Sequence, residues 1–237
     1  MIGMTRRSWM VPTLLLVTSA AAQTTPLHTS VGTTHGGRVA GGGVELPLEG
    51  DGYHFETNRG NPRARYGTPA LVGALVRASA EVARVHPGSD LAIHDLGFPN
   101  GGPIRGHGSH RSGRDVDVAY YALTPDGAPM NPTRSIGFLS HGRARGVPAD
   151  SAPRIDLERT WLLLRTLLVD EAIGVQYVFM APWLQRQLLA HAEGDPMSAA
   201  AARVLRTPRG RRVDPHADHL HLRIHCPPAD LEHGCVE

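Results

Sequence analysis

HADHLHLRIH, residues 216–225, predicts a β-strand with two chemically different faces. Successive side chains of a strand point to opposite faces, so His219, His221 and Arg223 share one face while the apolar residues between them share the other. Two imidazoles on one face of a strand form a geometry typical of metal sites. A single strand cannot complete such a site, so further ligands have to come from elsewhere in the chain.

GHGSHRSGRDVDV, residues 106–118, is the second informative stretch. Asp115 and Asp117 alternate with two valines, which predicts a strand with both carboxylates on one face. Gly113 allows a sharp turn just before this strand, so His110 can fold back toward Asp117. One loop and strand would then supply a nitrogen ligand and an oxygen ligand.

Together the two stretches contain the parts of a catalytic zinc site. Such a site needs three protein ligands and an open position for water, and we expect His110, Asp117 and His221 to be the ligands. His219 and His216 are then left for acid–base catalysis, a role that suits histidine because its ordinary pKa is near neutrality.

Asp115 shares its strand face with Asp117, and we expect it to orient a ligand imidazole by accepting a hydrogen bond. The competing interpretation is that the histidines bind stray metal or serve the surface, because the chain has 14 histidines. The catalytic hypothesis is favoured because both stretches combine metal-ligand residue types with the two-residue period of a strand.

The remaining sequence predicts an α+β fold in one domain. Thr68 and Pro69 begin a predicted helix that ends before Pro87, because a capping residue and a proline suit the first turn. Other expected elements are a helix over 155–173, strands over 89–96 and 175–180, and a short helix over 182–191. Residues 194–207 add a further predicted helix, 122–153 form a long connection, and 23–50 a loosely structured arm with a strand at 44–48.

Residues 1–22 have the three-part pattern of a cleaved secretory signal peptide. Arg6 and Arg7 precede an apolar run that is too short to span a membrane, and three alanines end at Ala22. Without these arginines the chain has 22 basic and 22 acidic residues. That balance argues against nucleic acid as a partner, and we predict an exported, periplasmic protein with no stable membrane span.

Cys226 and Cys235 are the only cysteines. In an exported chain they are expected to form a disulfide, which would contribute about 2–3 kcal/mol because the loop it closes is short. The alternative, that both bind a metal, is less favoured because their spacing matches no usual cysteine-pair motif.

The motifs resemble a known family of enzymes. His110 and Asp117, with HLH at 219–221, resemble the signature of the LAS metallopeptidases. The penicillin-insensitive murein endopeptidase group is a narrower resemblance, which covers the chain from about Val31 to its C-terminus. It rests on GHGSH at 106–110, Gly113, DVD at 115–117, the three histidines of 216–221, Arg223, Arg65-Tyr66, Asp95-Leu96-Gly97, Pro99, Gly101-Gly102 and the cysteine-containing tail.

This resemblance implies a small antiparallel sheet of the LAS-peptidase type that carries the zinc site, flanked by helices and long loops. It implies zinc bound by His110, Asp117 and His221, with His107 as a further ligand, and His219 and His216 as catalytic histidines. It also implies hydrolysis of peptide cross-links in peptidoglycan, including the D-alanyl-diaminopimelate bond, by an activated water.

Two other functions stay open from the sequence. One is a D,D-carboxypeptidase or dipeptidase that trims cell-wall peptides, and the other is a zinc-bearing binding module without catalysis. The oligomeric state is also left open. Five arginines, Arg111, Arg114, Arg209, Arg211 and Arg212, are candidates for binding the carboxylates of muropeptides, with a solvated surface as the equal alternative for each.

Overall fold

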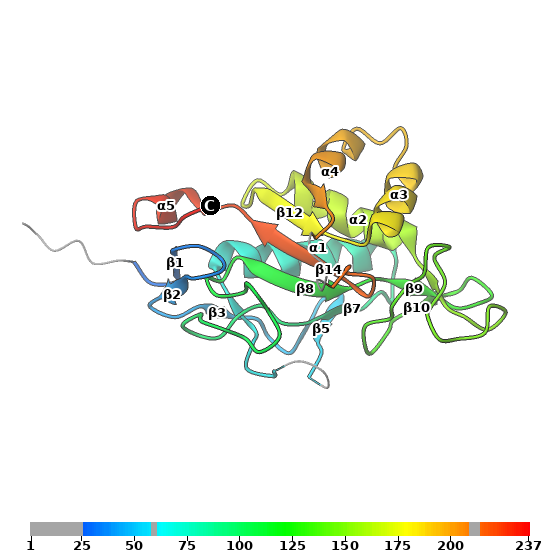
Figure 1. Ribbon diagram of the computed structural model, residues 1–237, viewed down its shortest axis with the longest axis horizontal. Helices are drawn as coiled ribbons and strands as arrows, with labels where there is room; N and C mark the ends of the chain where they lie inside the picture. The colour runs from blue at the N-terminus through cyan, green and yellow to red at the C-terminus, as the bar shows by residue number, and fades with distance from the viewer. Residues whose placement is uncertain (1–25, 58–60, 209–213) are drawn as a thin grey trace, which may run out of the picture.

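The computed structural model describes residues 26–57, 61–208 and 214–237. The expected signal peptide at 1–22 lies outside these ranges, as do Arg209, Arg211 and Arg212. A mixed seven-stranded sheet forms the centre of the molecule (Figure 1). Its strands, in spatial order, are β13 (Leu205–Arg206), β12 (Val175–Phe179), β14 (His219–Ile224), β8 (Asp115–Ala119), β7 (Leu91–Ile93), β5 (Tyr53–Phe55) and β4 (Glu49–Gly50).

The middle of this sheet is antiparallel, and a parallel pair adjoins it on each side. β12, β14, β8 and β7 pair antiparallel in succession, whereas β12 pairs parallel with β13 and β5 pairs parallel with β7. The α+β class is confirmed. The sheet is larger and more mixed than the small antiparallel sheet expected from the sequence, because two- and three-residue edge strands have no readable period.

Short strands also form where the sequence predicted loops. In the described part of the expected arm at 23–50, β1 (Thr29–Val31) pairs with β2 (Arg38–Ala40). β3 (Val44–Glu45), which pairs with β6 (Tyr66–Gly67), lies in the strand that was predicted at 44–48. Within the expected connection at 122–153, β9 (Ala122–Leu123) pairs with β10 (Pro129–Met130) and with β11 (Arg154–Ile155). These segments are therefore more regular than their composition indicates.

Five helices occur among the described residues: α1 (Pro69–Val85), α2 (Leu157–Val169), α3 (Pro182–His191), α4 (Ser198–Val204) and α5 (Pro228–Leu231). α1 begins as predicted, because the Thr68 side chain accepts a hydrogen bond from the Leu71 amide and Pro69 occupies the first turn. α1 and α2 pack together behind the central strands (Figure 1).

The central strands separate an apolar face from a polar one. Leu220, Leu222, Val116 and Val118 belong to one buried hydrophobic cluster that includes the inner faces of α1 and α2. The polar side chains of β8 and β14 lie on the opposite face. The period-2 patterns of both strands are thus confirmed, and the apolar cluster anchors the strands that carry the candidate site.

The C-terminal tail is fixed to the segment that contains β1. Cys226 and Cys235 form the predicted disulfide, and the Gly32 amide bonds to the Gly234 carbonyl beside β1. Buried Arg114 donates to the carbonyls of Val236 and Ile224, so it is a structural residue of the tail and not the substrate-binding arginine considered from the sequence.

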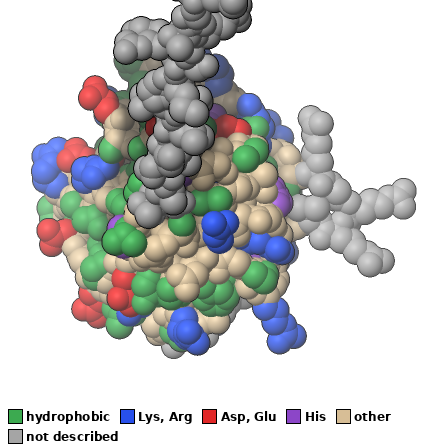
Figure 2. All heavy atoms as spheres, turned by 90° about the vertical axis from the view of Figure 1, so that its left-hand side faces the viewer, with side chains coloured by type: hydrophobic (Ala, Val, Ile, Leu, Met, Phe, Trp, Pro, Cys, Tyr) green, Lys and Arg blue, Asp and Glu red, His purple; other side chains and the backbone are tan. Residues whose placement is uncertain are grey.

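The face that holds α5, β1 and β2 carries interspersed basic, acidic and apolar side chains (Figure 2). Among the residues that the structure describes, every helix is too short or too polar to cross a membrane.

A buried arginine connects α2 with the segments that follow β8. The Arg159 guanidinium donates to Asp156, the capping residue of α2, and to the carbonyls of Ala122 and Met130. Both charged side chains are almost fully buried. Removing one member of such a pair leaves the other as an uncompensated buried charge.

Replacement of this guanidinium by an apolar chain, Arg159→Met, is therefore expected to lower the free energy of unfolding by about 3–5 kcal/mol. Urea denaturation followed by circular dichroism measures the change. The exposed Arg203→Gln on α4 is the control and should stay within about 0.5 kcal/mol of the parent protein. A small loss for Arg159→Met would show that the pair adds nothing to stability.

Candidate functional site

The two site strands place a histidine directly opposite a carboxylate. β14 pairs antiparallel with β8 in a register that sets His221 against Asp117 and Arg223 against Asp115. Directly paired residues have their side chains on the same face of the sheet, about 5 Å apart at Cβ. The register therefore brings together the two stretches that the sequence analysis singled out.

The loop before β8 brings His110 back over this pair. Gly113 has φ +72°, and a Cβ there would lie 2.9 Å from Val39 Cγ2 and 3.1 Å from the Thr68 amide nitrogen. His110 itself has φ 66°, which is uncommon for a residue with a side chain. Its Nδ1 bonds to the Leu96 carbonyl at 2.9 Å, so Nε2 points toward the strands.

Three potential ligand atoms converge above the strand pair. His110 Nε2 lies 3.3 Å from His221 Nδ1 and 3.4 Å from Asp117 Oδ1, and the last two atoms are 3.0 Å apart. All three side chains are buried. This places the three sequence-predicted ligand residues around one point.

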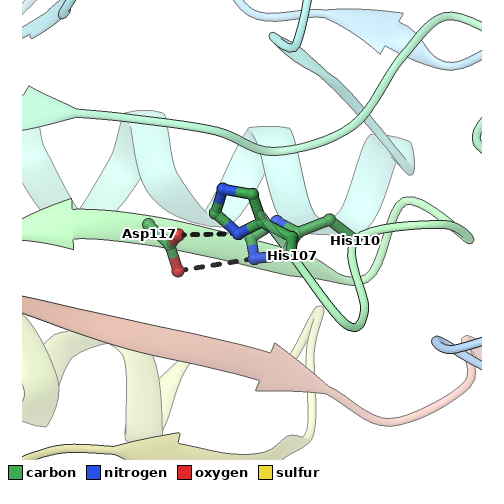
Figure 3. A group of neighbouring side chains, drawn as sticks. All are labelled: His107, His110 and Asp117. Atoms are coloured by element: carbon green, nitrogen blue, oxygen red, sulfur yellow. Dashed lines mark ion pairs between the residues drawn. The ribbon is translucent and has the colours of Figure 1, made fainter. Parts of the chain in front are cut away.

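His107 joins the same group from the loop. His107, His110 and Asp117 bring one ligand atom each within 4.8 Å of one another, and together they could hold a metal ion (Figure 3). His107 Nδ1 lies 3.5 Å from Asp117 Oδ2, whereas His110 faces Oδ1. The two histidines thus approach different oxygens of one carboxylate.

Acidic residues hold two of these imidazoles from behind. Asp115 Oδ1 lies 2.8 Å from His221 Nε2 and accepts a bond from Arg223 Nε at 2.7 Å. Asp95 lies 3.0 Å from His107 Nε2. In each ring Nε2 faces the acidic residue, and Nδ1 faces Asp117. Asp95 was not identified as part of the site in the sequence analysis, although it lies near the end of a predicted strand.

His219 and His216 lie beside the group and are only partly buried. His219 Nε2 is 3.8 Å from Asp117 Oδ1, and its Nδ1 lies 2.7 Å from Asp218. His216 Nδ1 lies 2.8 Å from the Asp214 carbonyl, and its φ is 57°. The two rings are 4.7 Å apart. Asp218 is a second residue that the sequence analysis missed, although it directly precedes His219.

Burial and neighbouring charges shift the pKa values of these side chains in different directions. Burial, reinforced by His219 and His221, lowers the pKa of His216 to about 4. Burial also opposes the charged form of His221, but the Asp117 and Asp115 carboxylates outweigh it and raise that pKa to about 9. Burial opposes the charged form of Asp117 as well, and the surrounding histidines hold its pKa well below the usual range.

Comparison with known proteins identifies relatives over almost the whole chain. A family model described as penicillin-insensitive murein endopeptidase matches residues 30–237. Curated proteins of that name from Escherichia coli O1:K1, strain SMS-3-5 and O127:H6 are each 28% identical over 236 residues, which cover 92% of this chain and 77% of theirs.

Proposed function

Because the chain belongs to the penicillin-insensitive murein endopeptidase family, we propose that it is a zinc-dependent endopeptidase that hydrolyses D-alanyl-diaminopimelate cross-links of peptidoglycan. The proposed ligands are His110, Asp117 and His221. The observation that carries the proposal is the convergence of their three atoms, each 3.0–3.4 Å from the other two. Ligands about 2.0–2.1 Å from a tetrahedral zinc are separated by about 3.3 Å.

The chemistry of Asp117 also fits a cation. Its Oδ1 is buried and accepts no hydrogen bond of good geometry, although nitrogens of three histidines lie 3.0–3.8 Å away. A buried anionic oxygen without a donor is costly. A divalent cation among these atoms removes that cost, and His107 is placed to act as a further ligand.

A zinc ion in this position supplies Lewis acidity, which lowers the pKa of a water molecule and polarises the scissile amide. The remaining steps belong to the protein. Asp218 fixes His219 Nδ1, so that Nε2 faces the ligand atoms and can take the proton of the attacking water. His219 then returns this proton to the leaving amine. His216 is the alternative base of the pair, because its Nδ1 lies on the Asp214 carbonyl and leaves Nε2 as a proton acceptor.

We further propose that residues 23–237 form one metallopeptidase domain of the LAS type, exported to the periplasm after cleavage near Ala22. The disulfide of Cys226 and Cys235 supports an oxidising compartment, and the substrate of the family supports one that contains peptidoglycan.

The function is tested with purified cross-linked muropeptide dimers, with and without a chelator. The expected result is conversion of dimers to monomers, loss of this activity on chelation and its recovery on addition of zinc. Release of free D-alanine with the dimers intact would instead identify a carboxypeptidase. Unchanged dimers with tightly bound zinc would identify a binding module.

Separate roles for His221 and His219 give a second prediction. His221→Ala should lose both zinc and activity, because it removes a ligand. His219→Ala should keep zinc and lose about 10²–10⁴-fold in turnover, because only proton transfer is removed. Metal content by atomic absorption and dimer cleavage rates measure the two effects. The exposed His191→Ala on α3 is the control, and full activity in His219→Ala would contradict its role.

Asp115 should control metal affinity without contacting the metal. Asp115→Asn keeps the shape of the side chain but removes the charge that orients His221, so zinc affinity is expected to fall about 10–100-fold. Competition with a chromophoric chelator measures the affinity. The exposed Asp150→Asn is the matched control, and equal affinities of the two variants would rule out this role for Asp115.

A further inference from the structure

A cavity of about 880 Å³ lies beside the catalytic histidines. One wall consists of residues 130–137 together with 144, 145, 147 and 153, and Glu56 and Asp218 line the rest. The Phe138 amide donates to the Ala217 carbonyl at 2.8 Å, which fixes this wall against the His216 to His219 segment. The cavity therefore adjoins the point where the amide would be cleaved.

A small hairpin brings two arginines to this cavity. Phe138 and Ala144 form an antiparallel bridge, and the Arg145 amide donates to the Gly137 carbonyl at 2.7 Å. Arg134 lies three residues before Gly137, and the next residue, Ser135, is hydrogen-bonded to His94 at 2.9 Å. The backbone that carries each guanidinium is thus held in place.

The charges of the cavity are only partly compensated. Glu56 lies 3.3 Å from His94, and Asp218 is held by His219. Arg134 and Arg145 are exposed, and neither side chain makes an ion pair or hydrogen bond with any residue that the structure describes. The cavity therefore presents two free guanidinium groups beside acids that already have partners.

We propose that this cavity binds a free carboxylate of the cross-linked peptide, and that Arg134 and Arg145 determine specificity for it. The proposal rests on the proposed function. In a D-alanyl-diaminopimelate cross-link, the carbon that bears the scissile nitrogen also bears a free carboxylate. A cavity that adjoins the catalytic histidines is where that carboxylate would lie, and arginine binds carboxylates through two parallel hydrogen bonds.

The test compares two dimers, one with this carboxylate free and one with it amidated. The parent protein should show a KM about tenfold lower for the free acid, as expected for charge-assisted hydrogen bonds. In the double variant Arg134→Gln/Arg145→Gln, KM for the free acid should rise to that of the amide, with kcat changed little. Arg186→Gln, an exposed arginine on α3 outside this cavity, should behave like the parent.

A parent-like preference in the double variant would overturn the proposal, as would an equal loss of kcat on both dimers. The terminal D-alanine of the dimer carries a second free carboxylate, and a third dimer that lacks this residue separates the two carboxylates. A preference that depended on the terminal D-alanine would overturn the stated assignment. Binding of the dimers to His219→Ala, measured by calorimetry, distinguishes failure of the subsite from failure of the proposed activity. Tighter binding of the free acid to this variant, together with no cleavage of either dimer by the parent protein, would reject only the activity.

Discussion

The pairing of His221 with Asp117 across β14 and β8 is the constraint on which the site depends. A shift of β14 by one residue would turn His221 into the hydrophobic cluster and bring leucine to the polar face. The apolar faces of the two strands prevent this, because Leu220, Leu222 and Val118 are packed in the core. The hydrophobic effect, which has no preference for metals, therefore sets the positions of two proposed ligands.

Precise placement of the imidazoles comes from a second set of contacts. A ring on a strand can still rotate, and the nitrogen that faces the centre is decided by the partner of the other nitrogen. The Leu96 carbonyl decides this for His110, Asp115 for His221 and Asp95 for His107. Asp115 also accepts a bond from the His110 amide at 3.3 Å. The Asp115 carboxylate thus connects the loop that carries His110 with β14, which fixes the two motifs relative to each other.

The sequence predicted the strands and most helices well because their signals are local. The two-residue period of DVDV and HLHLRI, and the proline at the start of α1 and α3, are properties of a few adjacent residues. Asp95, Asp218, Arg134 and Arg145 were missed for the opposite reason. Each gains its role from a neighbour placed by the fold, and an arginine in a loop has no pattern that separates it from the surface arginines around it. The short strands β1, β2 and β4 were missed because two or three residues cannot show a period.

The cluster of buried polar side chains at the site lowers the stability of the folded state. Buried imidazoles crowd one carboxylate whose Oδ1 accepts no well-formed bond, and His110 and His216 both adopt left-handed backbone angles. Such strain persists where the surrounding structure over-determines it. Here the over-determination comes from Gly113, from the disulfide-fixed tail and from the buried cluster beneath the strands. Ion binding at the convergent atoms would stabilise the folded state over the unfolded one, since the unfolded chain cannot bring residues 110 and 221 together. The chemistry of the site and the stability of the fold are therefore coupled. The same arrangement of histidines and Asp117 that would bind a metal ion also makes the stability of the fold depend on that ion.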